Sequence, residues 1–190
     1  MDYDAAVTVR YGSLSRRNDD ETTEGDAVAV DTSVIGRPTP SSRVVLERGP
    51  VSAFARAVTD PSPVYQDQSA AKAAGFAAIP APPTYAFAWE FMGKFPEAQP
   101  DNAGVAHPMM EIMAGLREKG GLILHGEQEF EYHRTPVVGD ELVSEGRASD
   151  LYEKESKGKT MTFIVTETVW KDVRSGDPVV TARFNLIHRS

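Results

Sequence analysis

The last 70 residues of the chain alternate apolar and polar side chains, and this pattern constrains the fold more than any other feature. Alternation over several residues is typical of an antiparallel strand with one face in the core. The apolar positions expected on the core face are Leu124, Phe130 and Tyr132, then Met161, Phe163, Val165 and Val169, and finally Val180, Ala182, Phe184 and Leu186. Turn sequences such as "PVVGDE" and "VRSGDP" separate these segments, and "DLYEKESKGKT" indicates a hairpin. We therefore expect several long antiparallel strands in this half.

Helical patterns precede these strands, after a first short strand near 44–46. Segments 49–58, 67–75 and 107–121 each combine helical spacing or high helix propensity with a suitable start or stop residue. The segment "YAFAWEFM", residues 85–92, is apolar on nearly every side, which predicts a helix buried on all faces. Helices early and strands late predict an α+β fold, in which an antiparallel sheet wraps around this central buried helix.

The charge of the chain is concentrated at its N-terminus. The net charge is −8, and residues 1–33 hold eight acids against three bases, so this segment contributes −5 and the rest −3. Such a polar, acidic composition predicts a flexible N-terminal arm over residues 1–33. Residues 34–190 are then expected to form a single domain, which is an ordinary length for one core.

The composition also excludes several classes of function. No basic stripe suggests a nucleic-acid partner, and no apolar run approaches the ~20 residues of a membrane span. The four histidines lack metal-ligand spacing, and there is no cysteine to form a disulfide or a thiolate site. The N-terminus has no apolar signal region, so we expect a cytoplasmic protein that binds neither nucleic acid nor membrane.

The segment "TDPSPVY" contains the residues that suggest chemistry. It resembles the motif of the MaoC-like hydratases and dehydratases, a branch of the hot-dog fold, which reads aspartate, spacer, asparagine, proline, aliphatic residue, histidine. Asp60, Pro63 and Val64 match this motif, whereas Ser62 replaces the asparagine and Tyr65 replaces the histidine. Members of this family add or remove water across the α,β double bond of an acyl thioester.

Two further segments resemble the substrate-binding half of such enzymes. "LHGEQ" at 124–128, with "YHRTPVVGD", is similar to the N-terminal repeat of two-repeat (R)-specific enoyl-CoA hydratases. "APPTY" at 81–85 is similar to the entry of the central helix in substrate-binding subunits of mycobacterial-type dehydratase heterodimers. In both groups a partner half supplies the Asp/His pair. The resemblance, over residues 35–188, implies a catalytic MaoC-like partner subunit, an acyl-CoA or acyl carrier protein thioester as substrate, and no cofactor.

The resemblance and the chemistry together nominate site residues. Hydration needs a base for water and donors for the enolate-like oxygen. The candidates for catalysis are Asp60, Tyr65 and His125, and those for substrate binding are Pro82, Thr84, Tyr85, Ala86, Ala88 and Gly126. A tyrosine with a pKa of about 10 is a poor general base. Pro82 and Pro83 have no N–H to offer an oxyanion.

Alternatives remain for two of these candidates. Asp60 precedes a proline, and such an aspartate commonly starts a turn, so a turn carboxylate is favoured over a direct catalytic role; a structural relic of a catalytic position is the third interpretation. Strict alternation places His125 on the polar face with Glu127 and Glu129, unless a bulge at Gly126 turns it to the other face.

Three functions are consistent with these residues. The first is a hydratase or dehydratase subunit that shapes the acyl tunnel while a partner hot-dog chain carries Asp and His. The second is a self-sufficient homodimeric hydratase that uses Asp60 with Tyr65 or His125. The third is a non-catalytic acyl-CoA-binding or thioesterase-type hot-dog protein.

Overall fold

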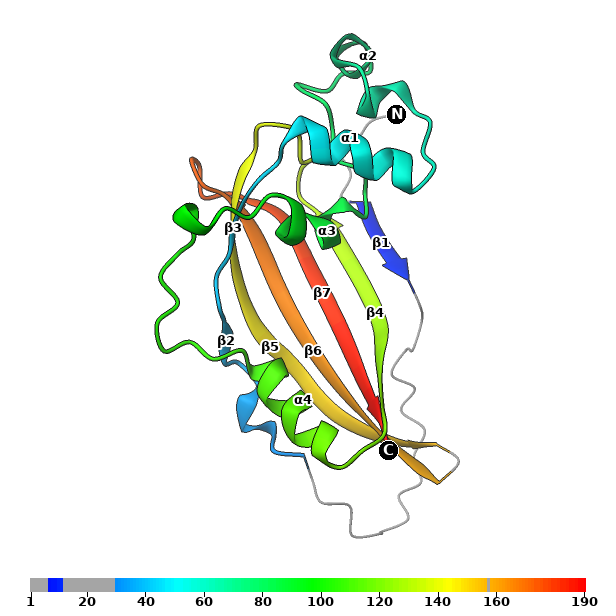
Figure 1. Cartoon of the computed structure of the whole chain (residues 1–190), viewed down its shortest axis with the longest axis vertical. Coiled ribbons are helices and arrows are strands. Elements are labelled where there is room, and N and C mark those ends of the chain that lie inside the picture. Colours follow the sequence, from blue (N-terminus) through cyan, green and yellow to red (C-terminus); the bar gives the residue numbers. More distant parts are fainter. Residues whose placement is uncertain (1–6, 12–29, 157) are drawn as a thin grey trace.

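The computed structural model of the chain describes residues 7–11, 30–156 and 158–190. Its main element is one antiparallel sheet of seven strands (Figure 1). The strands are β1 (Val7–Tyr11), β2 (Pro38–Thr39), β3 (Arg43–Val45), β4 (Leu122–Tyr132), β5 (Glu141–Ser156), β6 (Lys159–Asp172) and β7 (Pro178–Arg189). They lie in the order β1-β4-β7-β6-β5-β2, and β3 also pairs with β5. The long strands β5 and β6 form the predicted hairpin.

Four α-helices accompany the sheet: α1 (Arg48–Ala57), α2 (Gln68–Ala73), α3 (Tyr85–Met92) and α4 (Pro108–Glu118). Short 3₁₀ helices occupy Thr32–Val34, Pro63–Tyr65 and Pro96–Ala98. Figure 1 shows α3 and α4 over one face of the sheet, with α1 and α2 beyond its end. This arrangement confirms the α+β hot-dog architecture. No helix of the described residues has the length and apolar character needed to cross a bilayer.

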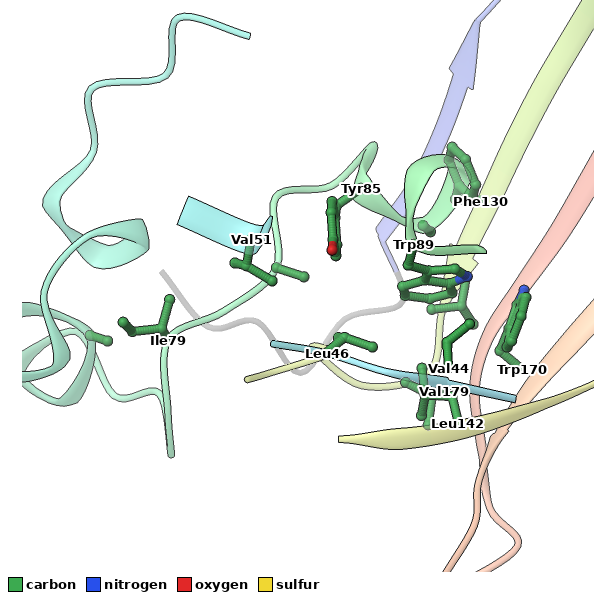
Figure 2. Packing of buried hydrophobic residues seen from close by; sticks show 14 residues of the cluster. Val44, Leu46, Val51, Ile79, Tyr85, Trp89, Phe130, Leu142, Trp170 and Val179 are labelled. Carbon is green, nitrogen blue, oxygen red and sulfur yellow. The ribbon is translucent and has the colours of Figure 1, made fainter. Parts of the chain in front are cut away.

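The core consists of two clusters on the helix-bearing face. In the first, Trp89 of α3 lies edge-on to Trp170 of β6 with ring centroids 5.2 Å apart, and Phe130 of β4 is also buried there (Figure 2). In the second, Met109, Met113 and Leu116 of α4 pack on Ile164 of β6. The helix predicted over 107–121 is therefore confirmed, and its apolar residues pack on the sheet.

The prediction that the central helix is buried on all faces is wrong. Tyr85 and Trp89 are fully buried, but Phe87 is 47% exposed and Phe91 is 82% exposed. The reason is that α3 is only eight residues long and a single sheet covers one side of it. Among the described residues, nothing covers one apolar side of α3 fully.

The prediction that the odd-numbered apolar residues of β6 face the core is also wrong, because pairing with β7 decides which residues of β6 face the helices. Ile164 pairs with Leu186 and Trp170 with Val180, so the even-numbered residues of β6 face the helices. Phe163 lies on the opposite face, where it stacks on Tyr152 with ring centroids 4.7 Å apart. The face predicted for β7, which includes Val180 and Leu186, is confirmed.

Leu124 is a second exception to simple alternation. It pairs with Ile187, on the face opposite to Phe130, because the register of β4 shifts between His125 and Gln128. Its side chain is 38% exposed, so the predicted grouping of Leu124 with Phe130 and Tyr132 is wrong.

Two described pieces fall within the segment predicted to be a flexible acidic arm. Val7–Tyr11 form β1, which pairs with β4 at the edge of the sheet, and Thr32–Val34 form a 3₁₀ helix. The remainder, residues 1–6 and 12–29, lies outside the described residues. The division of the chain at residue 34 stays a prediction.

Candidate functional site

A cavity of about 530 Å³ lies between the "DPSPVY" loop and the end of β4. Its lining residues combine apolar side chains with four hydroxyl-bearing residues and one guanidinium. The lining residues are Ser62, Val64, Tyr65, Ala73, Ala74, Phe76, Pro80, Ala81, Pro83, Tyr132, Arg134, Thr135 and Pro136. The cavity therefore joins three segments that the sequence singled out: the degenerate motif, the proline-rich entry to α3, and "YHRTP".

The loop is held in place by hydrogen bonds to α1. The Asp60 N–H donates to the Ala55 carbonyl over 2.9 Å, which ends the helix. The Ser52 hydroxyl donates to the Tyr65 carbonyl over 2.6 Å. Pro63 and Tyr65 lie in a 3₁₀ turn that begins with a proline, whose fixed φ suits that position. The Tyr65 side chain reaches the cavity wall as a result.

Asp60 acts as a turn residue. Its carboxylate accepts a hydrogen bond from the Ser62 N–H over 3.0 Å, an Asx-type arrangement. Asp60 is not among the described residues that line the cavity. This geometry favours the structural interpretation of Asp60 over a catalytic one.

Thr59, the residue before Asp60, is the only non-glycine residue of the described chain with a positive φ, at 58°. It ends α1 in the left-handed conformation that helices usually assign to glycine. We expect Thr59→Gly to raise the free energy of unfolding by about 0.5–1 kcal/mol, because the Cβ penalty disappears. Urea unfolding measures this. Thr59→Ala keeps the Cβ and is the control; an equal gain from alanine would contradict the backbone explanation.

Arg134 is the only cation among the described residues that line the cavity. It is held by Asp140 at 2.6 Å and by Asp172 at 2.8 Å. Burial disfavours its charge, but the two carboxylates outweigh this and raise the pKa of Arg134. Because two acids already neutralise it, Arg134 orders the cavity wall rather than offering a free charge to an anion.

The Arg134–Asp172 pair predicts an acid-dependent loss of stability. The N–H groups of Arg174 and Ser175 hold the pKa of Asp172 below its ordinary value of 3.8, and Arg134 lowers it further. As pH falls, the Asp172 carboxylate is protonated in the unfolded chain before it is protonated in the folded one. Its contribution to the free energy of unfolding is therefore fully present above the ordinary pKa and is lost as pH falls through the lowered pKa of the folded state. We expect Asp172→Asn to cost on the order of 1 kcal/mol at neutral pH. Urea unfolding of the wild type and of Asp172→Asn at several pH values should show the difference in free energy of unfolding vanish in acid. A difference that does not depend on pH would contradict this explanation.

His125 lies at a different place on the sheet. A bulge between His125 and Gln128 turns it to the face that bears the helices, so the bulge alternative is confirmed and the polar-face prediction is wrong. Its ring lies 5.6 Å from Phe87 of α3 and 4.7 Å from Phe184 of β7, centroid to centroid. A Cβ on Gly126 would meet Ile187 at 2.9 Å, so the bulge needs glycine here.

The structure does not bring the three catalytic candidates together. His125 is seven residues along β4 from Tyr132 of the cavity wall, which corresponds to about 20 Å of strand. Tyr65 belongs to the cavity and His125 to the surface beside α3. An Asp60–Tyr65–His125 centre is therefore absent within this chain.

None of the predicted substrate-binding residues at the start of α3 lines the cavity. The cavity touches Pro83 but not Pro82, Thr84, Ala86 or Ala88 among the residues described. The Pro82 carbonyl accepts from the Tyr85 N–H over 2.9 Å, and the Pro83 carbonyl accepts from the Tyr132 hydroxyl. The backbone carbonyls before the first turn of α3 are therefore already hydrogen-bonded within the protein. The proposed contact of Ala86 and Ala88 with an acyl chain stays a prediction.

Tyr85 differs from the rest because its hydroxyl is buried and has no partner among the described residues. Burial, with a smaller effect of Glu47, raises its pKa to about 12, so the hydroxyl keeps its proton. It packs edge-on against Phe54 of α1, 5.2 Å between ring centroids. Tyr85 is therefore a core residue that ties α3 to α1.

Sequence reasoning did not place Phe76, Tyr132 and Arg134 at the cavity, or Asp140 beside Arg134. The segment "YHRTPVVGD" was singled out only for its likeness to hydratases. The turn signal "VVGD" could have located Asp140 near Arg134, because a six-residue separation across a turn brings the two side chains back together.

Comparison with known proteins identifies the class to which these features belong. Residues 33–182 match the family model described as "FAS1-like, dehydratase domain region". A UPF0336 protein of Streptomyces avermitilis is 31% identical over 86% of this chain and 97% of its own length. A probable enoyl-CoA hydratase alpha subunit of Thermomonospora curvata is 34% identical over 70% of this chain, which corresponds to 42% of that protein.

Solved structures share the fold. A chain of the ChsH1-ChsH2 complex from Mycobacterium tuberculosis aligns with a TM-score of 0.65 and 22% identity, over 80% of this chain and 83% of that one. A chain of the truncated HadBC (3R-hydroxyacyl-ACP dehydratase) complex from the same organism aligns with a TM-score of 0.57 and 19% identity, over 82% and 98%.

Proposed function

Because this chain belongs to the MaoC-like family of FAS1-like dehydratase domains, we propose that it is one subunit of an (R)-specific enoyl-thioester hydratase or 3-hydroxyacyl-thioester dehydratase of the cytoplasm. It shapes the acyl-binding site, and a partner hot-dog chain supplies the Asp/His pair. The substrate is an acyl-CoA or an acyl carrier protein thioester, and no cofactor takes part. The relative named as an enoyl-CoA hydratase alpha subunit supports a multi-subunit enzyme.

One observation carries this proposal: the cavity at the family's motif position contains a tyrosine and no imidazole among its described lining residues. Tyr65 is at the position of the family's histidine, and Asp60 is bonded into a turn. His125 is about 20 Å away along β4. A water molecule at this cavity would have no base that is poised near neutral pH.

The reaction explains why the missing base matters. Hydration puts a hydroxyl on the β-carbon and a proton on the α-carbon, so a base must take a proton from water while charge develops on the thioester oxygen. Tyr65 and Ser62 can orient a bound group by hydrogen bonding, but a phenol is a poor general base near neutrality because free tyrosine has a pKa of about 10. The partner's Asp and His provide this step in our proposal.

The uncovered side of α3 is where we place the partner. Phe87, Phe91 and Met92 expose apolar surface there, and His125 lies against Phe87. Exposed apolar clusters on otherwise polar proteins mark interaction sites. The neighbouring stretch 122–127 of β4 has a second strand on one side only among the described residues, so it can also receive a partner strand.

Co-expression with the product of an adjacent reading frame that encodes an intact "D-x-N-P-x-H" motif tests the proposal. We expect this chain alone to be inactive in a crotonyl-CoA hydration assay and the complex to be active. In the complex, Asp60→Ala should change the rate by less than about 3-fold, compared with about 100-fold or more for loss of a general base. Brisk hydration by the isolated chain would favour the homodimeric enzyme, and binding of acyl-CoA without turnover in any combination would favour the non-catalytic protein.

A further inference from the structure

One edge of β4 is paired with a strand of the same chain, β1. β1 pairs antiparallel with β4 over five residues, from Val7 opposite Tyr132 to Tyr11 opposite Gln128 (Figure 1). On its other side β4 pairs with β7 along its length, from Leu122 to Tyr132. One edge of a strand pairs with a single neighbour, so β1 and a partner strand cannot both pair with residues 128–132.

The same edge continues beside the uncovered side of α3. Among the described residues, the stretch 122–127 has β7 on one side and no strand on the other. His125, in the middle of this stretch, contacts Phe87 of α3. A partner sheet that docks on α3 and on 122–127 therefore reaches β1 as it extends along β4.

We propose that β1 is an intramolecular competitor that occupies residues 128–132 of β4 in the free chain and leaves this edge when the partner sheet pairs with it. The inference rests on the proposed function, because it adds a regulatory step to the assembly of that enzyme. In the free chain β1 also shields an edge that would otherwise be open to non-specific strand pairing.

The position of β1 makes it suited to reversible release. It is five residues long and has β4 as its single neighbour in the sheet, whereas β7, β6 and β5 are at least twelve residues long. Short terminal strands with one neighbour open at a lower free energy than the central strands of a sheet. The strands β4, β7, β6 and β5 pair with one another in an unbroken order that does not depend on β1.

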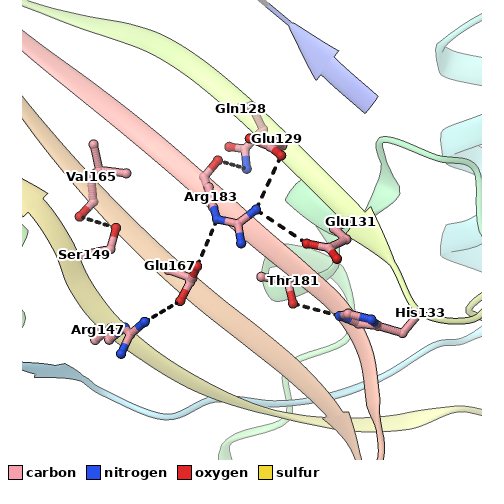
Figure 3. A network of polar contacts seen from close by, with 10 residues as sticks. All are labelled: Gln128, Glu129, Glu131, His133, Arg147, Ser149, Val165, Glu167, Thr181 and Arg183. Atoms are coloured by element: carbon pink, nitrogen blue, oxygen red, sulfur yellow. Dashed lines mark hydrogen bonds and ion pairs between the residues drawn. The ribbon is translucent and has the colours of Figure 1, made fainter. Parts of the chain in front are cut away.

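Beside β1, the face of the sheet opposite the helices bears a polar network that shows no obstacle to this exchange. Figure 3 shows its network, in which Arg183 of β7 contacts Glu129 at 3.4 Å and Glu131 at 3.6 Å on β4, and Glu167 of β6 at 2.9 Å. These contacts join β4 to the sheet interior through side chains on one face. β1 pairs with β4 through backbone N–H and C=O groups, which are separate from these side-chain contacts. We therefore expect β4 to stay in place when β1 leaves.

A double proline substitution in β1 tests the inference. Successive N–H groups of a strand point to opposite sides, so Thr8→Pro with Val9→Pro removes at least one donor that faces β4. Thr8→Ala with Val9→Ala keeps both donors and is the matched control. Neither pair changes α3 or β4, which hold the proposed docking surface.

The free protein gives the first readout. Within residues 128–132 of β4, we expect hydrogen exchange of the amides that face β1 to accelerate in the proline variant, while those that face β7 stay protected; all should stay unchanged in the alanine control. Unchanged exchange in the proline variant would show that β1 does not protect this edge, and the inference would be rejected.

Association gives the second readout. If β1 occupies the edge about 90% of the time, its removal should tighten association about 10-fold, since apparent affinity scales with the competent fraction. We would measure affinity for the adjacent-frame hot-dog chain by titration calorimetry, and self-association by sedimentation. Unchanged values in both measurements overturn the inference. Tighter association without hydration activity supports edge competition and rejects the proposed function, so the two failures are distinguishable.

Discussion

Phe91→Glu should weaken binding of the partner hot-dog chain by about 100-fold or more while leaving the fold intact. Phe91 is 82% exposed on the uncovered side of α3, so the single chain loses almost no packing when it changes. In the complex that we propose, the ring becomes a buried apolar anchor, and large aromatic anchors dominate interface energies. A carboxylate placed there must be desolvated without a partner, which adds to the loss. Calorimetric titration of the partner measures the effect.

A control for this variant is Ile35→Glu. Ile35 is also apolar and is 43% exposed. The N–H of the next residue, Gly36, donates to a carbonyl of β5, which lies toward the edge of the sheet opposite to β4. It should leave partner affinity within about 2-fold, because surface substitutions outside an interface have small effects. Equal losses from both variants, or wild-type affinity in Phe91→Glu, would place the interface elsewhere.

The second large effect is expected from Gly93→Ala, which should lower the free energy of unfolding by about 2–3 kcal/mol. A Cβ on Gly93 would lie 2.3 Å from the backbone oxygen of Val45. The Gly93 carbonyl also accepts the Val45 N–H over 2.9 Å, so this hydrogen bond fixes the close approach of α3 to β3. Neither backbone can retreat without losing contacts: Val45 is paired with Glu141 of β5, and Trp89 anchors α3 in the core.

Gly115→Ala is the matched control for Gly93→Ala. Gly115 lies inside α4, and nothing stands within 4 Å of a Cβ built there. The same glycine-to-alanine change should therefore stabilise the protein by about 0.5–1 kcal/mol through helix propensity. Thermal or urea unfolding measures both variants. A loss below about 0.5 kcal/mol for Gly93→Ala would mean that α3 and β3 approach each other less closely than the structure indicates.

The local elements of this protein follow from its sequence alone. The bounds of α3 are the best example: the prolines before Thr84 exclude an earlier helical start, and Gly93 ends the helix after Met92. The turns at 137–140 and 173–177 and the inward face of β7 follow from local chemistry in the same way. The degenerate motif at Asp60 and Tyr65 was also visible, so the sequence identified one wall of the candidate cavity.

Tertiary structure decided which side each element presents. The period-2 pattern of β6 offers apolar residues on both faces, so only its pairing with β7 could choose Ile164 over Phe163 for the core. A register shift of β4 turned His125 toward α3, and alternation alone cannot place such a shift. The apolar character of α3 predicted burial but not which side of the helix the sheet would cover. One sheet covers one side of this helix, and Phe91 on the other side remains exposed because no second apolar surface is present in the chain described here.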